Sequence, residues 1–174
     1  MILKEFYSAV SGLSFTLLGL WWAVATLRRE EWGADRSRRR MARQIALSFL
    51  LPGVMSLVSL LAVRVTVVWN VGFGLAGALG AVSTAALLAG DTERSPGGGA
   101  GRLVLLAMVV LYSLIAVVAV FPKSVAMVGV GLRPLEVEGI LVSIFVFLGV
   151  NLAWLFLFDP LPELPGPESR RRRS

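Results

Sequence analysis

Long runs of hydrophobic residues alternate with short clusters of charge along the chain. A helix that crosses a bilayer needs about 20 mostly apolar residues, because each residue advances it by about 1.5 Å. Five runs reach that length, and a charged residue occurs only at the first position of the last one. The pattern predicts membrane-spanning helices over residues 6–27, 44–63, 71–90, 103–121 and 138–158.

The composition agrees with a bilayer as the surrounding medium. Hydrophobic residues make up 56% of the 174 positions, and charged residues make up 16%, against about 25% in soluble domains. A soluble chain of this length could not bury so much apolar surface in one core. We therefore expect an all-α integral membrane protein, with a single five-helix transmembrane bundle over residues 1–158. Residues 159–174 contain four prolines and four arginines, which predicts a disordered basic tail.

Basic residues fall mainly on one side of the predicted spans. Thirteen of the 17 Lys and Arg residues lie on the side of the C-terminus, and four lie on the other side. Cytoplasmic segments of membrane proteins are enriched in Lys and Arg, so we expect the N-terminus outside and the C-terminus in the cytoplasm. The excess of Arg over Lys, with abundant Ala, Gly, Val and Leu, suggests a bacterial cytoplasmic membrane.

The arginine-rich segments also indicate which partners to expect. Such segments attract anionic lipid at the membrane surface, so the bilayer is the expected partner on the cytoplasmic side. Nucleic acid is not expected, because aromatic and basic residues do not alternate as in proteins that stack bases.

Small and hydroxyl-bearing residues share one face of the first predicted span. At about 100° per residue they fall within an arc of about 140°. The members of this face are Ser8, Ser11, Gly12, Thr16, Gly19 and Thr26. Small residues let helices approach closely, and hydroxyls can bond across the contact. The face therefore either packs against a helix or lines a conduit, and periodicity leaves both open.

The third predicted span contains a string of glycines. Gly72, Gly74 and Gly77 spell G-x-G-x-x-G, a spacing found in dinucleotide-binding folds. Here the string continues through an uncharged run as long as a membrane span, which excludes the required βαβ unit, and no cofactor is expected. We interpret the string instead as a helix-packing seam of small residues. Its members are Gly72, Ala76, Gly77, Gly80 and Ser83.

A few polar residues lie within or beside the predicted spans. Arg64 directly follows the second span, and Glu136 and Glu138 lie at the start of the fifth, so an ion pair at the outer surface is expected. Asn151 and Ser143 share a face of the fifth span, and Tyr112 lies near the middle of the fourth. A buried amide must find partners in hydrocarbon, so we expect Asn151 to link helices or to contact a solute.

The residue types exclude several kinds of chemistry. The chain has no Cys and no His, which removes thiolate nucleophiles, Ser–His catalysis and Cys/His metal sites. The acids lie in loops or at span ends, so no proton relay within the membrane is expected. We expect a non-catalytic multi-pass membrane protein, without metal, that acts as a subunit or small homo-oligomer assembled through its Gly/Ser faces. A small channel or passive permease along the Ser8–Thr26 face remains open. So does a membrane-surface enzyme that uses edge carboxylates, Asp91 with Glu93 or Glu136 with Glu138.

Overall fold

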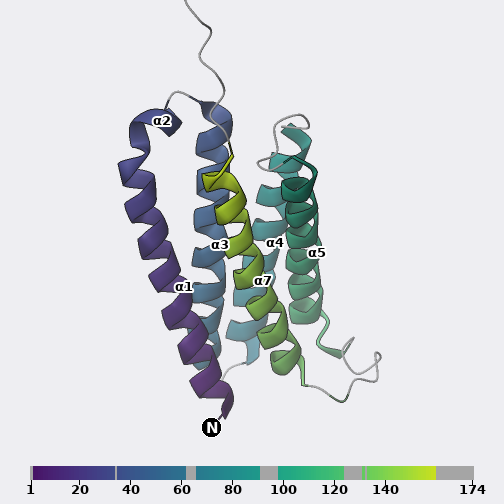
Figure 1. The fold of residues 1–174 in the computed structure, drawn as a ribbon. Helices are drawn as coiled ribbons and strands as arrows, with labels where there is room; N and C mark the ends of the chain where they lie inside the picture. The colour runs from purple at the N-terminus through teal and green to yellow at the C-terminus, as the bar shows by residue number, and fades with distance from the viewer. Residues whose placement is uncertain are drawn as a thin grey trace, which may run out of the picture.

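The computed structural model describes residues 2–33, 35–61, 66–90, 98–123, 131 and 133–159. These residues form helices and contain no strand. In chain order the helices are α1 (Ile2–Leu27), α2 (Arg29–Gly33), α3 (Arg36–Leu61), α4 (Thr66–Gly90), α5 (Gly99–Val120) and α7 (Pro134–Leu157). Five of these helices are long and apolar enough to cross a membrane, and they run up and down through the molecule (Figure 1).

The expected all-helical fold with five potential spans is confirmed, with longer helices than predicted. The helix α3 begins at Arg36 rather than at residue 44, and α4 begins at Thr66 rather than at residue 71. Apolar runs mark the thickness of the hydrocarbon layer, which is about 30 Å. A helix can continue beyond that layer with polar residues, as α3 does from Arg36, whereas α4 extends through the further apolar residues Val67, Val68 and Trp69. The predicted disordered tail lies almost entirely beyond the described residues, which end at residue 159.

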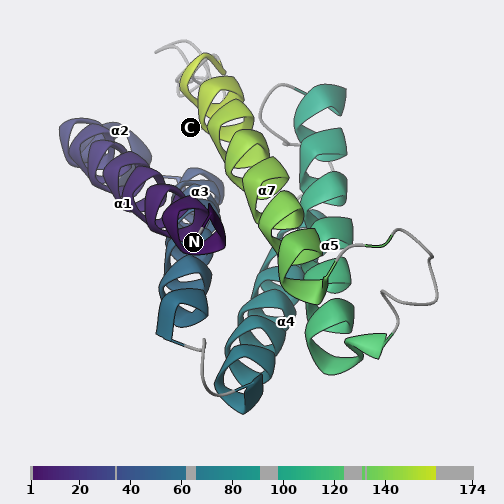
Figure 2. The same cartoon turned by 90° about the horizontal axis from the view of Figure 1, so that it is seen from below.

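The helices form two antiparallel pairs with a fifth helix between them. The closest pairings are α4 with α5 and α1 with α3. The helix α7 packs against α5, α3 and α1, and the view along the bundle in Figure 2 shows it between the two pairs. One consequence is that α7 contributes side chains to both ends of the bundle interior.

The interior contains two hydrophobic clusters. One includes Trp21, Phe49, Met108 and Phe145, and lies toward the end of the bundle where α2 turns the chain. The other includes Tyr7, Met55, Trp69, Phe73 and Ile115, toward the opposite end.

The outer surface of the bundle is also apolar. Leu13, Leu20, Leu75, Leu79 and Phe147 are each more than half exposed. Many large apolar side chains exposed on several helices are typical of contact with a membrane or with another protein. Together with the lengths of the helices, it indicates a multi-pass membrane protein.

Candidate functional site

A short helical elbow joins α1 to α3. The helix α1 ends at Leu27, α2 covers only five residues, and α3 begins at Arg36. The Ser37 amide donates a hydrogen bond of 2.8 Å to Oδ1 of Asp35, which caps the first turn of α3. The elbow places the arginine-rich start of α3 beside the last turns of α1.

Three aromatic rings fix the elbow against the bundle. The Trp21 indole donates a hydrogen bond of 2.9 Å to the Ala42 carbonyl of α3. Its ring stacks on Trp32 of α2, with the centroids 5.6 Å apart. The Trp32 ring in turn makes an edge-to-face contact with Phe156 of α7, with the centroids 5.0 Å apart. Because buried indoles need a partner for the N–H, this arrangement is specific as well as apolar.

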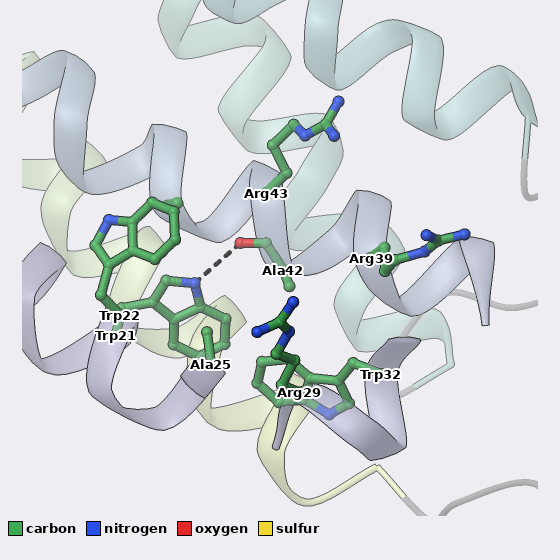
Figure 3. A pocket seen from close by; sticks show the side chains of 9 residues that line it. Trp21, Trp22, Ala25, Arg29, Trp32, Arg39, Ala42 and Arg43 are labelled. Atoms are coloured by element: carbon green, nitrogen blue, oxygen red, sulfur yellow. Dashed lines mark hydrogen bonds between the residues drawn. The ribbon is translucent and has the colours of Figure 1, made fainter. Parts of the chain in front are cut away.

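A cavity of about 510 Å³ opens between α1, α2 and α3 at this elbow. We call it the elbow pocket (Figure 3). Its lining residues are Trp21, Trp22, Ala25, Arg29, Trp32, Arg39, Ala42, Arg43 and Ala46. The wall is thus built from indole rings and alanines, and three arginines contribute to it.

The charge around the elbow pocket is strongly positive. Arg29, Arg39 and Arg43 are exposed and form no ion pair with a side chain that the structure describes. Arg38, which does not line the pocket, is only 9% exposed and lies 3.8 Å from the Asp159 carboxylate. The Arg40 guanidinium reaches the other way, toward Gly90 at the end of α4. The pocket therefore suits a ligand that carries negative charge beside an apolar portion.

This pocket was not predicted from the sequence. The arginines were interpreted as signals of orientation and as segments that attract anionic lipid at the membrane surface. The sequence nevertheless contains an indication of the pocket. Only a short segment separates a tryptophan pair near the end of one span from the arginines at the start of the next.

The Gly/Ser face predicted on α1 lies mostly on the outside of the protomer. Only Ser11 is buried, while Ser8, Gly12, Thr16, Gly19 and Thr26 are exposed. An added Cβ at Gly12 or Gly19 would meet nothing within 4 Å. The Thr16 and Thr26 hydroxyls donate to carbonyls of their own helix. Within one protomer these five residues neither pack against another described helix nor line a conduit.

A different stripe of α1 faces the interior, and it includes Tyr7, Ser11, Ser14 and Trp21. Tyr7 and Trp21 carry polar groups that reach carbonyls on neighbouring helices. These anchors determine which face turns inward.

The glycine string of α4 lies at close helix contacts. A Cβ at Gly77 would lie 2.9 Å from backbone atoms of Tyr112 and Ala116 on α5, and one at Gly80 would overlap the Tyr112 ring. A Cβ at Gly72 would lie 2.8 Å from Val58 on α3. Two further members of the seam belong to the same helix: Ala76 is buried, and the Ser83 hydroxyl donates to the Gly80 carbonyl.

The polar residues predicted within the fourth and fifth spans are not brought together. The Asn151 amide donates to the Phe147 carbonyl at 2.8 Å, and the Ser143 hydroxyl donates to the Gly139 carbonyl at 3.0 Å. Both partners lie one turn back on α7, so the expected link between helices is replaced by bonds within one helix. Tyr112 is fully buried, and its ring lies 4.1 Å from that of Phe145.

The two acids predicted to lie at the outer surface, Glu136 and Glu138, lie in different environments. Glu136 accepts a hydrogen bond of 2.8 Å from the Arg133 amide and so caps the start of α7. Glu138, one turn inside α7, is completely buried rather than at the edge. Arg64 lies outside the described residues, as do Asp91 and Glu93. Glu136 and Glu138 therefore do not form an exposed pair of carboxylates.

No protein-family model matches the chain, and no curated protein or solved structure matches it either.

Proposed function

We propose that the protein is a non-catalytic multi-pass membrane protein that binds the headgroup of an anionic phospholipid in the elbow pocket. The observation that carries this proposal is a cavity lined by tryptophans and by three arginines that have no described acidic partner. The five apolar helices supply the membrane context.

The chemistry of the lining fits a phospholipid better than a soluble anion. Guanidinium groups bind phosphate oxygens with two parallel hydrogen bonds. Tryptophan prefers the headgroup level of the bilayer, where one end of the ring is apolar and the other meets water. Trp22 is 61% exposed at the rim, and the alanine wall offers apolar surface to the glycerol region of a lipid.

The size and position of the pocket agree with this ligand. Small-molecule pockets have volumes of about 300–1,000 Å³, and the elbow pocket has about 510 Å³. It lies at the end of the bundle where most of the described basic residues lie, and the excess of Lys and Arg favours that end as the cytoplasmic one. The ligand would therefore come from the inner leaflet.

The proposal can be tested by lipid binding to the full chain in detergent, measured by native mass spectrometry. Arg39→Gln with Arg43→Gln should weaken phosphatidylglycerol binding by about 25-fold, at about 1 kcal/mol for each arginine. Arg40→Gln is the matched control, because this residue is on the same helix and points away from the pocket. It should change binding by less than about twofold.

Two results would contradict the proposal. One is equal weakening by Arg40→Gln, which would indicate a diffuse surface charge. The other is equal binding of phosphatidylcholine, which would show that the anionic headgroup is not selected. If inorganic phosphate competes with the lipid at a similar concentration, the ligand of the pocket is instead a soluble anion.

A second candidate function is assembly, either into a homo-oligomer or with a membrane partner subunit. It rests on the exposed residues of the Gly/Ser face of α1. Gly12 and Gly19 leave open space at the surface, which would let a second helix approach closely. A channel or permease along this face would then run between protomers. Gly12→Leu should reduce oligomer size in single-molecule photobleaching in lipid, whereas Leu13→Ala should not. Unchanged oligomer size with Gly12→Leu would exclude this face as the contact.

A further inference from the structure

A single carboxyl group is enclosed at the end of the bundle opposite the elbow. Glu138 lies in the second turn of α7 and has no exposed surface. The N-terminus of α1, the end of α3 and the starts of α4 and α7 meet at this end, which Figure 2 views directly. Both carboxylate oxygens lack a hydrogen-bond partner among the described residues.

The polar neighbours of Glu138 come from other helices. The Tyr7 hydroxyl of α1 lies 3.4 Å from the position that a Cβ on Gly139, the residue after Glu138, would occupy, and it lies beside Ser59 of α3. It donates a hydrogen bond of 2.6 Å to the Leu135 carbonyl. The Trp69 indole of α4 also approaches the carboxyl, yet the two groups do not meet the geometry of a hydrogen bond.

The surroundings are otherwise apolar. Tyr7 and Trp69 belong to the cluster that contains Met55, Phe73 and Val142. In such a medium a carboxyl group stays protonated unless a counter-charge or a metal ion compensates its ionised form. Within the part of the chain that the structure describes, no cationic side chain pairs with Glu138.

We propose that Glu138 forms a binding site for one monovalent metal cation, sodium or potassium, together with the hydroxyl oxygens of Tyr7 and Ser59. The Tyr7 and Ser59 hydroxyls donate their protons to backbone carbonyls, which leaves oxygen lone pairs available to a cation.

The charge of the site selects the class of cation. One carboxylate neutralises one positive charge, and the remaining ligands are uncharged oxygens. Calcium sites commonly use several carboxylates, and the described residues contain no cluster of three or more acidic, His or Cys side chains that could hold a metal. An alkali cation bound by oxygen therefore fits better than a divalent or transition metal.

The site has a short connection to the surface. Glu138 is the fifth residue of α7, which begins at Pro134, so it lies about 6 Å along the helix axis from the start. A cation could exchange from the side that the charge asymmetry assigns to the outside. This inference does not depend on lipid binding at the elbow.

The test is the melting temperature of the full chain in lipid nanodiscs. Sodium or potassium chloride is titrated against N-methyl-D-glucamine chloride, so that ionic strength stays constant. Wild-type protein should melt about 3–6 °C higher at a cation concentration ten times Kd. The separate sodium and potassium titrations show which cation is preferred. Glu138→Gln should remove the dependence, whereas Glu136→Gln, two residues away and at the helix cap, should keep it.

Tyr7→Phe provides a second variant that does not depend on the folding of Glu138→Gln. It should shift the titration to higher cation concentration by removing one oxygen ligand. A wild-type melting temperature that follows ionic strength alone would overturn the proposal. A cation dependence that survives unchanged in both Glu138→Gln and Tyr7→Phe would also overturn it. A cation dependence that is absent in wild type and appears only in Arg64→Gln would overturn the proposal too, because Arg64 would then be the counter-charge of Glu138 in the wild-type protein.

Discussion

Adding one methyl group to the α4 seam should destabilise the bundle, and Gly80→Ala is the sharpest case. The new Cβ would overlap the ring of Tyr112 on α5. That ring is completely buried and lies 4.1 Å from the ring of Phe145 on α7. It therefore has no space to move into, and either α4 and α5 must separate or the contact with α7 must shift.

The magnitude follows from two opposing terms. Overpacking a filled interior costs about 1–3 kcal/mol, while replacing Gly by Ala within a helix gains about 0.5–1 kcal/mol. Because both the ring and the backbone resist movement here, we expect a net loss of about 1–2 kcal/mol. Gly77→Ala should behave similarly, because its Cβ would lie 2.9 Å from two backbone atoms of α5.

The matched control is Gly12→Ala on α1, where an added Cβ meets nothing within 4 Å. Within one protomer only the gain in helix propensity applies there, so this variant should be equal to wild type or more stable by up to about 1 kcal/mol. The measurement is reversible unfolding of the full chain in mixed micelles, monitored by circular dichroism. Combining Gly80→Ala with Tyr112→Leu should cost less than the sum of the two changes, because the clash is then relieved. Equal stability of Gly80→Ala and Gly12→Ala would refute the close contact.

Three further changes test other contacts of the bundle by the same unfolding measurement. Thr84→Val should cost about 1–3 kcal/mol, because the buried Gln44 amide loses the hydroxyl to which it donates at 2.6 Å; a neutral result would mean that the amide finds another partner. Asp35→Ala should cost about 1 kcal/mol through loss of the cap of α3, and an unchanged stability would show that the cap contributes nothing. Asn151→Leu should stay within about 0.5 kcal/mol of wild type, since its amide bonds only to its own helix; a large loss would instead support a link between helices.

The existence and approximate position of the helices were predictable because hydrocarbon thickness imposes a length on apolar runs. The face of α1 that points into the bundle was not predictable. In a lipid environment, apolar side chains can face either way, so hydrophobic periodicity carries little information about the interior. The small residues suggested a contact face, whereas Tyr7 and Trp21 turn inward because their polar groups bond to α7 and α3.

The two candidate sites escaped prediction for different reasons. The elbow pocket depends on α2, a five-residue helix that brings Arg29 and Trp32 against α3. Nothing in the spacing of residues specifies that turn. Glu138 stands at the boundary of an apolar run, and its sequence position is compatible with either the surface or the interior. Its burial follows from α7 beginning one turn earlier, at Pro134.

The central claim is a membrane-spanning bundle with the elbow pocket at its cytoplasmic face, and labelling of single cysteines tests it most directly. The chain contains no cysteine, so Lys4→Cys and Arg36→Cys, both at exposed positions, each introduce a unique thiol. With a membrane-impermeant maleimide, Lys4→Cys should react in intact cells, and Arg36→Cys should react only after the membrane is opened. Reaction of Arg36→Cys in intact cells would contradict the account.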